Sequence, residues 1–573
     1  MVSDATMPSA APTGGAARIV SVAATGDATI DGLMSGAAWL DTPSFGFPAL
    51  RSDYEADYGG VAPDSGFAQA SFAQIQAVRQ VLTGSTPDAG GPVMHYGSIA
   101  SFTLLNPGEV QSPGTADLRY AQSTSPATAY TYTPWAAAGD GSAADPTAGD
   151  VWFGKNYPAL TSPQPGNYGW AVILHETGHA LGLKHTGEVT GPGGIVFPAG
   201  LDSLEHTVMS ARSLPNGSPG LWTNEASGYP QTYMPLDIAA LQHLYGANFE
   251  ANAGDTTYGW SPDTGEMFID GVGQGTPSAN RIFLTIWDGG GTDTYDLSNY
   301  VNGVTIDLQP GASSAASAAQ LAVLDAAQGI RAAGNIYNAL LFEGDPRSLI
   351  ENATGGSGDD SVTGNAAGNR LLGNGGNDTL FGLDGDDTLQ GGPGDDVLDG
   401  GAGADTFIFD LSSETVAGTA APGASLFGLT NALRDPDAGG AGWGQHFAKL
   451  MAWWSAGEGG FAGSPLQQWV SMMADHGRGP RAAPDQILVR SEGSDTITHF
   501  SEGDVLRFDL PRASVEPHVT VSLTDADGDG AADTELRFDG GGGITLLDTQ
   551  YASLAQLAEG GRLQFATDAA VIA

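Results

Sequence analysis

The chain contains no cysteine in its 573 residues, so no disulfide can cross-link the fold and no thiolate can bind a metal. Basic residues are scarce as well: 20 Lys and Arg stand against 65 Asp and Glu, and the formal net charge is -45. This charge opposes binding to nucleic acid and to anionic lipid, and it fits oxygen-rich sites for hard cations, calcium above all. We therefore expect no nucleic-acid partner.

Long apolar runs are also missing. No run approaches the roughly 18 residues that a membrane-spanning helix requires, and Met1 to Arg18 lacks both the basic start and the apolar core of a signal peptide. Residues 1–24 are rich in small residues and proline, and we interpret them as a flexible tail or pro-segment. No membrane span is expected, and the chain is long enough for about two to four domains.

Histidines are few, but three of the ten fall within the run HETGHALGLKH from His175 to His185. On a helix, His175 and His179 project from one face, so two imidazoles can bind one ion. Gly182 permits a backbone conformation that ends the helix and lets the chain turn back, which brings His185 to the same ion. Three neutral imidazoles leave a tetrahedral zinc with one open position for water, as in catalytic sites.

Glu176 directly follows the first of these histidines. Zinc lowers the pKa of its water towards about 7, and Glu176 is placed to take the proton and to pass it to a leaving amine. The alternative is a buried helix with incidental histidines. The added glycine and the third histidine at fixed spacing disfavour that alternative.

Several other segments have a clear period. Apolar residues at 72–82 recur at helical spacing, and residues 237–246 have the acidic start and the glycine stop of a helix. Strands are predicted at residues 116–120, 127–132 and 150–153. A strand beside the zinc cleft could pair with an extended peptide through main-chain hydrogen bonds.

From Gly355 the chain repeats every nine residues, and six consecutive units keep two columns in register. The sixth position carries an acid or its amide: Asp360, Asn369, Asp378, Asp387, Asp396 and Asp405. The eighth position is apolar: Val362, Leu371, Leu380, Leu389, Leu398 and Phe407. Such a repeat predicts short turn-strand units stacked into a parallel roll with a thin core. A flexible glycine-rich linker, the alternative, would not explain two columns.

Aligned carboxylates between neighbouring turns of such a roll would repel one another, so we expect calcium to close the stack. A separate acidic stretch, Asp525 to Asp533, resembles the start of a calcium loop but lacks a glutamate at the twelfth position. Calcium binding and a solvated turn remain equal alternatives there.

The zinc motif together with Met209 in the run TVMS resembles the metzincin metallopeptidases, in which a methionine turn lies beneath the metal. The segments 237–259 and 286–294 narrow the resemblance to the serralysins, secreted zinc proteases with a calcium-binding β-roll of the RTX type. The resemblance implies an α+β metzincin-like catalytic domain over residues 25–258. An all-β parallel β-roll domain would follow over residues 259–573, with its nonapeptide repeats at 355–408.

The resemblance also implies the cofactors, which are one catalytic zinc held by His175, His179 and His185 and several structural calcium ions. The calcium ligands that it implies are Asp288, Gly290, Asp293, Glu351, Asp360, Asp378, Asp387, Asp396 and Asp405.

The function that the resemblance implies is a secreted, monomeric endopeptidase that hydrolyses protein or peptide substrates through a zinc-bound water activated by Glu176. A bacterial type I secretion apparatus would export it. The ending from Asp568 to Ala573 places an acid before an apolar tail, as in the uncleaved C-terminal signals of that pathway.

Two features depart from the family. The serralysin tyrosine that ligates zinc, two residues after the turn methionine, is replaced by Ala211, which leaves Arg212, His206 or Tyr229 as possible oxyanion donors. Residues 411–488 interrupt the roll and carry aromatic residues at helical spacing, so a helical insertion is expected. It would either pack on the roll or present a surface to a partner or substrate. The alternative function is a calcium-dependent surface or adhesive protein with a vestigial protease domain, against which the intact Glu176 argues.

Overall fold

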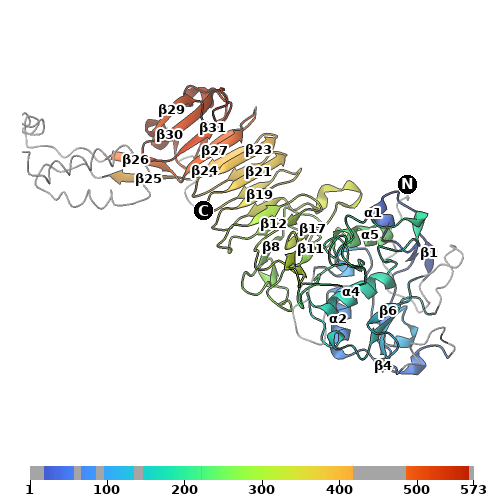
Figure 1. The fold of residues 1–573 in the computed structure, drawn as a ribbon. Helices are drawn as coiled ribbons and strands as arrows, with labels where there is room; N and C mark the ends of the chain where they lie inside the picture. The colour runs from blue at the N-terminus through green and yellow to red at the C-terminus, as the bar shows by residue number, and fades with distance from the viewer. Residues whose placement is uncertain are drawn as a thin grey trace, which may run out of the picture. The chain divides into compact units, whose positions relative to one another are not determined.

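The computed structural model describes residues 18–56, 58, 66–85, 96–134, 146–220, 222–416, 486–501 and 503–566 (Figure 1). The chain divides into two compact units. The first comprises Met1–Phe407 with His499–Asp504, and the second comprises Ile408–Thr498 with Val505–Ala573. This division falls at the end of the repeats. The domain boundary predicted from the sequence, between the catalytic domain and the β-roll domain, lies near residue 258.

The N-terminal part of the first unit is built on a sheet in which β3, β5, β7 and β6 are neighbours in that order. β5 pairs parallel with β3 and β7, whereas β6 pairs antiparallel with β7 and forms the edge. The strands are β3 (Phe45–Gly46), β5 (Leu118–Ser123), β6 (Ala129–Thr131) and β7 (Asp150–Gly154), and β4 (Ala68–Gln69) pairs antiparallel with β5. The predicted strands at 116–120, 127–132 and 150–153 are thereby confirmed in kind, with small shifts of their ends.

The helices of this part share one apolar core with the sheet. They are α1 (Ala28–Asp31), α2 (Phe72–Thr83), α3 (Ile99–Phe102), α4 (Tyr168–Ala180) and α5 (Pro235–Tyr245). A capping box between Ser71 and Gln74 starts α2, and Gly84, with a φ of 72°, ends it. The helices predicted at 72–82 and 237–246 are confirmed. A short sheet of β1 (Ile19–Ser21) and β2 (Ala37–Trp39) completes the part.

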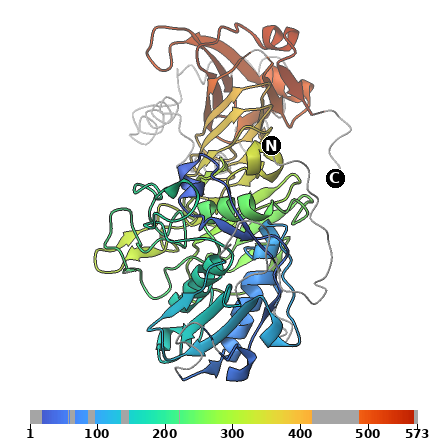
Figure 2. The same cartoon turned by 90° about the vertical axis from the view of Figure 1, so that its right-hand side faces the viewer.

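The predicted parallel roll is confirmed, and its strands alternate between two sheets (yellow-green to yellow in Figures 1 and 2). One sheet contains β8 (Thr257–Trp260), β12 (Thr294–Asp296), β18 (Asn352–Thr354), β20 (Arg370–Leu372), β22 (Thr388–Gln390) and β24 (Thr406–Phe409). The other contains β13 (Thr305–Asp307), β19 (Ser361–Thr363), β21 (Thr379–Asp384) and β23 (Val397–Ala402). Two repeats make one full turn, because Leu371 pairs with Leu389 and Val362 with Leu380. All six apolar residues of the eighth column are fully buried.

The described residues of the second unit form further strands and two short helices. They are β25 (Leu411–Val416), β26 (Gln486–Ser491), β27 (Ser494–His499), β28 (Val505–Phe508), β29 (Val519–Thr524), β30 (Asp533–Phe538), β31 (Gly543–Leu546), β32 (Leu563–Phe565), α9 (Arg512–Val515) and α10 (Leu554–Glu559). The antiparallel pair β25–β26 frames the predicted helical insertion, so both ends of residues 411–488 are strands.

Residues 417–485, which include the segments expected to be helical, lie outside the described residues, as do most of the predicted tail and the predicted C-terminal signal. Among the described residues, no helix is long and apolar enough to cross a membrane.

Candidate metal centre

The helix α4 carries the first two histidines of the zinc motif. The Asn167 side chain accepts a hydrogen bond from the backbone N–H of Trp170 and caps the helix, and every residue from Gly169 to Ala180 is buried. Just beyond its end, Gly182 has a φ of 100°, and a Cβ at this position would lie 2.5 Å from the carbonyl oxygen of Ala37. Only glycine fits both the conformation and the space, so the sequence prediction of a glycine-mediated stop is confirmed.

The turn after Gly182 brings the three predicted ligands together. The Nε2 atom of His175 lies 3.1 Å from that of His179 and 3.1 Å from that of His185, and the last two are 3.2 Å apart. A tetrahedral zinc with bonds of about 2.0–2.1 Å would separate two nitrogen ligands by about 3.3 Å, which is close to this spacing. The three side chains therefore fit a zinc ion.

The opposite ring nitrogens fix which tautomer faces the centre. Nδ1 of His175 lies 2.8 Å from the carbonyl oxygen of Val208, and Nδ1 of His179 lies 3.0 Å from that of Leu183. Because a carbonyl only accepts, both Nδ1 atoms carry the proton and both Nε2 lone pairs point inward. Burial, with the neighbouring imidazoles, lowers the pKa of His175 to about 4 and that of His179 well below its usual value, so both are neutral ligands at neutral pH.

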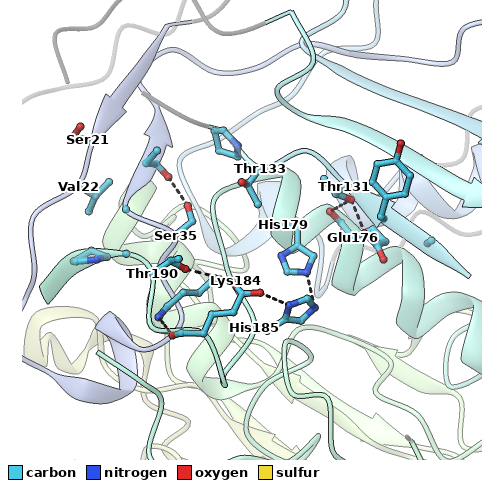
Figure 3. A pocket seen from close by; sticks show the side chains of 18 residues that line it. Ser21, Val22, Ser35, Thr131, Thr133, Glu176, His179, Lys184, His185 and Thr190 are labelled. Carbon is cyan, nitrogen blue, oxygen red and sulfur yellow. Dashed lines mark hydrogen bonds and ion pairs between the residues drawn. The ribbon is translucent and has the colours of Figure 1, made fainter. Parts of the chain in front are cut away.

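Glu176 lies next to this centre and is buried (Figure 3). The Thr131 hydroxyl, on the edge strand β6, donates a hydrogen bond of 2.7 Å to its Oε2. Burial raises the pKa of Glu176 to about 7, against the opposing effect of Thr131. A carboxyl group with a pKa near neutrality is suited to take up a proton and to return it.

Met209 lies beneath the helix, as predicted for a methionine turn. It is fully buried, and a Cβ at Gly178 would lie 2.8 Å from its sulfur. The turn is held by Asp237, whose carboxylate accepts hydrogen bonds from the Thr207 hydroxyl at 2.5 Å and from the Val208 N–H at 2.7 Å. The sequence predicts Asp237 only as the acidic start of a helix. Its position in the first turn of the helix that follows the methionine turn is the one feature of the sequence that indicates its contact with that turn.

A cleft of about 830 Å³ opens over the centre (Figure 3). Glu176, His179 and His185 line this cleft, together with the edge strand β6. The remainder of its lining includes residues 21–22 and 190–192. The edge strand thus borders the space in which the three imidazoles and the carboxylate meet.

The three possible oxyanion donors have different surroundings. Arg212 is engaged, because its guanidinium donates to Asp202 at 2.9 Å and to the carbonyl oxygen of Gly217. Burial lowers the pKa of His206, which favours its neutral form. The ring of Tyr229 lies 5.7 Å from that of Trp222, and Trp222 in turn lies 5.9 Å from the ring of His175. Trp222 was not predicted from the sequence, and its indole N–H donates to the carbonyl oxygen of Ser210.

We expect Ala211→Tyr to raise kcat, because a phenol at this position could donate to the oxyanion as in the serralysins. One such donor is worth on the order of 3 kcal/mol, or about a hundredfold in rate. Steady-state kinetics on a peptide substrate would measure the gain. Ala211→Phe is the control, since it adds the ring without the hydroxyl. An unchanged rate in Ala211→Tyr would show that another residue already donates.

Three carboxylates in the column of the roll each have one buried oxygen without a hydrogen-bond partner. Oδ1 of Asp378 accepts the N–H of Asp360 at 2.8 Å, and Oδ1 of Asp387 accepts that of Asn369 at 2.7 Å. Oδ2 of Asp378, Asp387 and Asp405 is buried without a hydrogen-bond partner. These orphaned oxygens fit a bound cation, which would satisfy them.

The space beside these oxygens is kept open by glycine. A Cβ at Gly373 would lie 2.2 Å from Oδ2 of Asp378 and 2.6 Å from the carbonyl oxygen of Gly391. A Cβ at Gly382 would lie 2.2 Å from Oδ2 of Asp387. Carboxylate and carbonyl oxygens around one small space are the ligands that calcium takes.

The first two units of the column differ. Both oxygens of Asp360 accept backbone N–H groups, from Val304 at 2.7 Å and from Gly356 at 2.5 Å. The side-chain amide of Asn369 donates to the carbonyl oxygen of Glu351 at 2.8 Å. Hydrogen bonds therefore satisfy the side chains of the first two units without a cation. The surroundings of Asp360 fit a calcium ion less well than those of the later positions.

A cluster of three acidic side chains, Asp288, Asp293 and Glu351, lies near the start of the roll. Asp293 donates its backbone N–H to Glu351 at 2.8 Å, Gly290 donates its N–H to Asp288 at 2.7 Å, and Oδ2 of Asp293 is buried without a hydrogen-bond partner. Burial, with repulsion between neighbouring carboxylates, raises the pKa of Asp288 and of Asp293 above the ordinary range and raises that of Glu351 to about 7. Three buried acids that repel one another also fit a cation.

Comparison with known proteins agrees with this geometry. Residues 247–421 match the family described as Peptidase M10 serralysin C terminal. Metallopeptidase AprA of Pseudomonas marginalis is 34% identical over 249 residues, which are 42% of this chain and 46% of that protein. Over these residues the chain is similar to the serralysin-type metalloproteases.

Two further serralysins show the same extent of similarity. Serralysin B of Dickeya chrysanthemi is 33% identical over 38% of this chain and 40% of its own length, and serralysin of Proteus mirabilis is 34% identical over 38% of this chain and 39% of its own. The chain thus spans less than half the length of these relatives. The solved structure of the AlgE6R3 subunit of the Azotobacter vinelandii mannuronan C5-epimerase aligns at 22% identity over 38% of this chain and 83% of that one. Its TM-score of 0.18 is too low to indicate a shared fold.

Proposed function

We propose that the protein is a zinc-dependent endopeptidase that cleaves protein substrates. The observation that carries the proposal is the convergence of three imidazole Nε2 atoms within 3.2 Å of one another, with the buried carboxyl group of Glu176 beside them in an open cleft. A zinc ion held by His175, His179 and His185 would supply a water of lowered pKa and would polarise a substrate carbonyl.

The chain's own residues supply the remaining steps. Glu176 takes a proton at its carboxylate and later returns it to the leaving amine, because burial raises its pKa to about 7. Thr131 holds that carboxylate with a hydrogen bond of 2.7 Å and so keeps it in one orientation. The free edge of β6 can bind an extended peptide through main-chain hydrogen bonds, which accept many sequences. These features belong to the proposed α+β metzincin-like domain at 25–258.

The roll is proposed to hold several structural calcium ions, and the orphaned oxygens described above support this. Secretion as a monomer through a type I apparatus is part of the same proposal and rests on the resemblance to the serralysins. The alternative, a calcium-dependent adhesive protein with a vestigial protease domain, draws on Ala211. It predicts calcium binding without any hydrolysis.

The test is hydrolysis of casein by the full chain. A chelator should abolish the activity and added zinc should restore it. His179→Ala should lose the zinc, because two imidazoles hold the ion far less tightly than three, and metal analysis after dialysis would measure the loss. His243→Ala, which changes an exposed histidine on α5, is the matched control and should keep its zinc. Full zinc content in His179→Ala would refute the assignment, and a zinc-loaded native protein without activity would refute the peptidase.

A further inference from the structure

The three zinc-binding imidazoles are held in two different ways. Backbone carbonyl groups accept the Nδ1 protons of His175 and His179. In contrast, Nδ1 of His185 lies 2.6 Å from a carboxylate oxygen of Glu188. Glu188 therefore contacts a metal ligand on the side away from the metal.

We infer that Glu188 is a positioning residue for the third metal ligand, an inference that rests on the zinc site of the proposed function. An ionised carboxylate only accepts, so it holds the proton on Nδ1 and leaves the Nε2 lone pair of His185 facing the other two histidines. A carboxylate behind a metal-binding imidazole also strengthens the bond of that imidazole to the metal.

The ring of His185 is enclosed less completely than the rings of the other two ligands, so a hydrogen bond contributes more to its orientation. His175 and His179 are 9% and 7% exposed, and the surrounding core restricts their rings. The side chain of His185 is 45% exposed and that of Glu188 is 44% exposed. A half-buried imidazole is held less firmly by its neighbours, and the contact with Glu188 favours the orientation toward the metal.

The loop that carries Glu188 is anchored from below by Lys184. This lysine is only 2% exposed, and its ammonium group donates to the carbonyl oxygen of Glu188 at 2.6 Å and to that of Ile195 at 2.7 Å. The Thr190 hydroxyl lies 3.3 Å from the second carboxylate oxygen of Glu188. Lys184, His185 and Thr190 all line the cleft (Figure 3). The backbone and the side chain of Glu188 are thus both held where the carboxylate meets His185.

A merely structural ion pair between exposed residues would have a different signature. Such pairs contribute little to stability, and removing one would leave both the folding and the zinc affinity nearly unchanged. Loss of a carboxylate behind a metal-binding histidine typically costs 10-fold to 100-fold in metal affinity. Zinc affinity, measured apart from folding and from catalysis, therefore distinguishes the two roles.

The experiment uses the full chain and three variants, Glu188→Ala, Glu188→Gln and the control Glu250→Ala, which removes an exposed glutamate from another loop. Competition with a chromophoric chelator gives the Kd for zinc, and the Tm of the zinc-free protein reports folding. We expect Glu188→Ala to weaken zinc binding about 10-fold to 100-fold at an unchanged Tm. Glu188→Gln should recover part of this loss, because its amide oxygen can still accept the Nδ1 proton, and Glu250→Ala should bind zinc normally.

Native zinc affinity in Glu188→Ala would overturn the inference. An equal loss in Glu188→Ala and Glu188→Gln with a lower Tm would overturn it too, because the loop itself would then have unfolded. The readout needs no substrate. A protein that binds zinc with these differences but cleaves no casein would refute the proposed peptidase and still support the role of Glu188.

Discussion

Glu176→Gln should remove most of the casein hydrolysis and leave the zinc in place. Glutamine has the same size and can still accept the hydrogen bond that Thr131 donates to Glu176. Its amide cannot take up a proton. The activation of the water therefore loses its general base, and the release of the amine loses its general acid. General acid–base groups typically contribute about a hundredfold to ten thousandfold to the rate.

Two measurements on the same sample check this result. Metal analysis should give the native zinc content, because the three imidazoles and their Nδ1 contacts are untouched, and kcat should fall by the factor above. Glu250→Gln, which changes an exposed glutamate, serves as the control and should have native kinetics. A native rate in Glu176→Gln would mean that another group acts as the base.

Local patterns in the sequence predicted the parts of the centre that lie on one helix or in one repeat. The spacing of His175, His179 and His185 with Gly182 between them determines how the ligands converge, because it depends only on helix geometry and on one turn. The inward column of the roll is equally local, since each unit contributes one apolar residue to a strand of three to six residues.

Contacts between distant segments were not predictable in this way. Thr131 reaches Glu176 from a strand 45 residues earlier, and Asp237 holds the methionine turn from a helix 29 residues after Val208. Neither residue belongs to a periodic pattern, so only the fold shows its partner. Asp360 matches its column in sequence, yet hydrogen bonds satisfy both its oxygens, because Val304, which precedes the repeats, donates to one oxygen and Gly356 of its own unit donates to the other.

Calcium should stabilise the protein by an amount that grows as the pH rises from about 5 to about 8. Without the ion, burial and neighbouring carboxylates raise the pKa of Asp378 and Asp387 to about 7 and also raise that of Asp293, well above the ordinary range of an aspartate. The folded, calcium-free protein thus binds protons more tightly than the unfolded chain. Its stability therefore falls as the pH rises through this range. Calcium replaces the lost protons, and each site at about 100 times its Kd adds about 2.7 kcal/mol.

Asp387→Asn tests the same argument with opposite signs. At pH 8 without calcium it should raise the Tm, because a buried charge beside other carboxylates is removed, and Asn369 shows that the column accepts an amide. At saturating calcium it should lower the Tm, because a charged ligand is lost. Asp263→Asn is the control, since this exposed aspartate lies in the turn after β8, outside the repeats. Thermal unfolding followed by circular dichroism, with calcium or with a chelator at both pH values, gives the four Tm values for each protein. A native protein whose Tm gains as much from calcium at pH 5 as at pH 8 would contradict the competition between protons and calcium, and with it the assignment of these carboxylates as ligands.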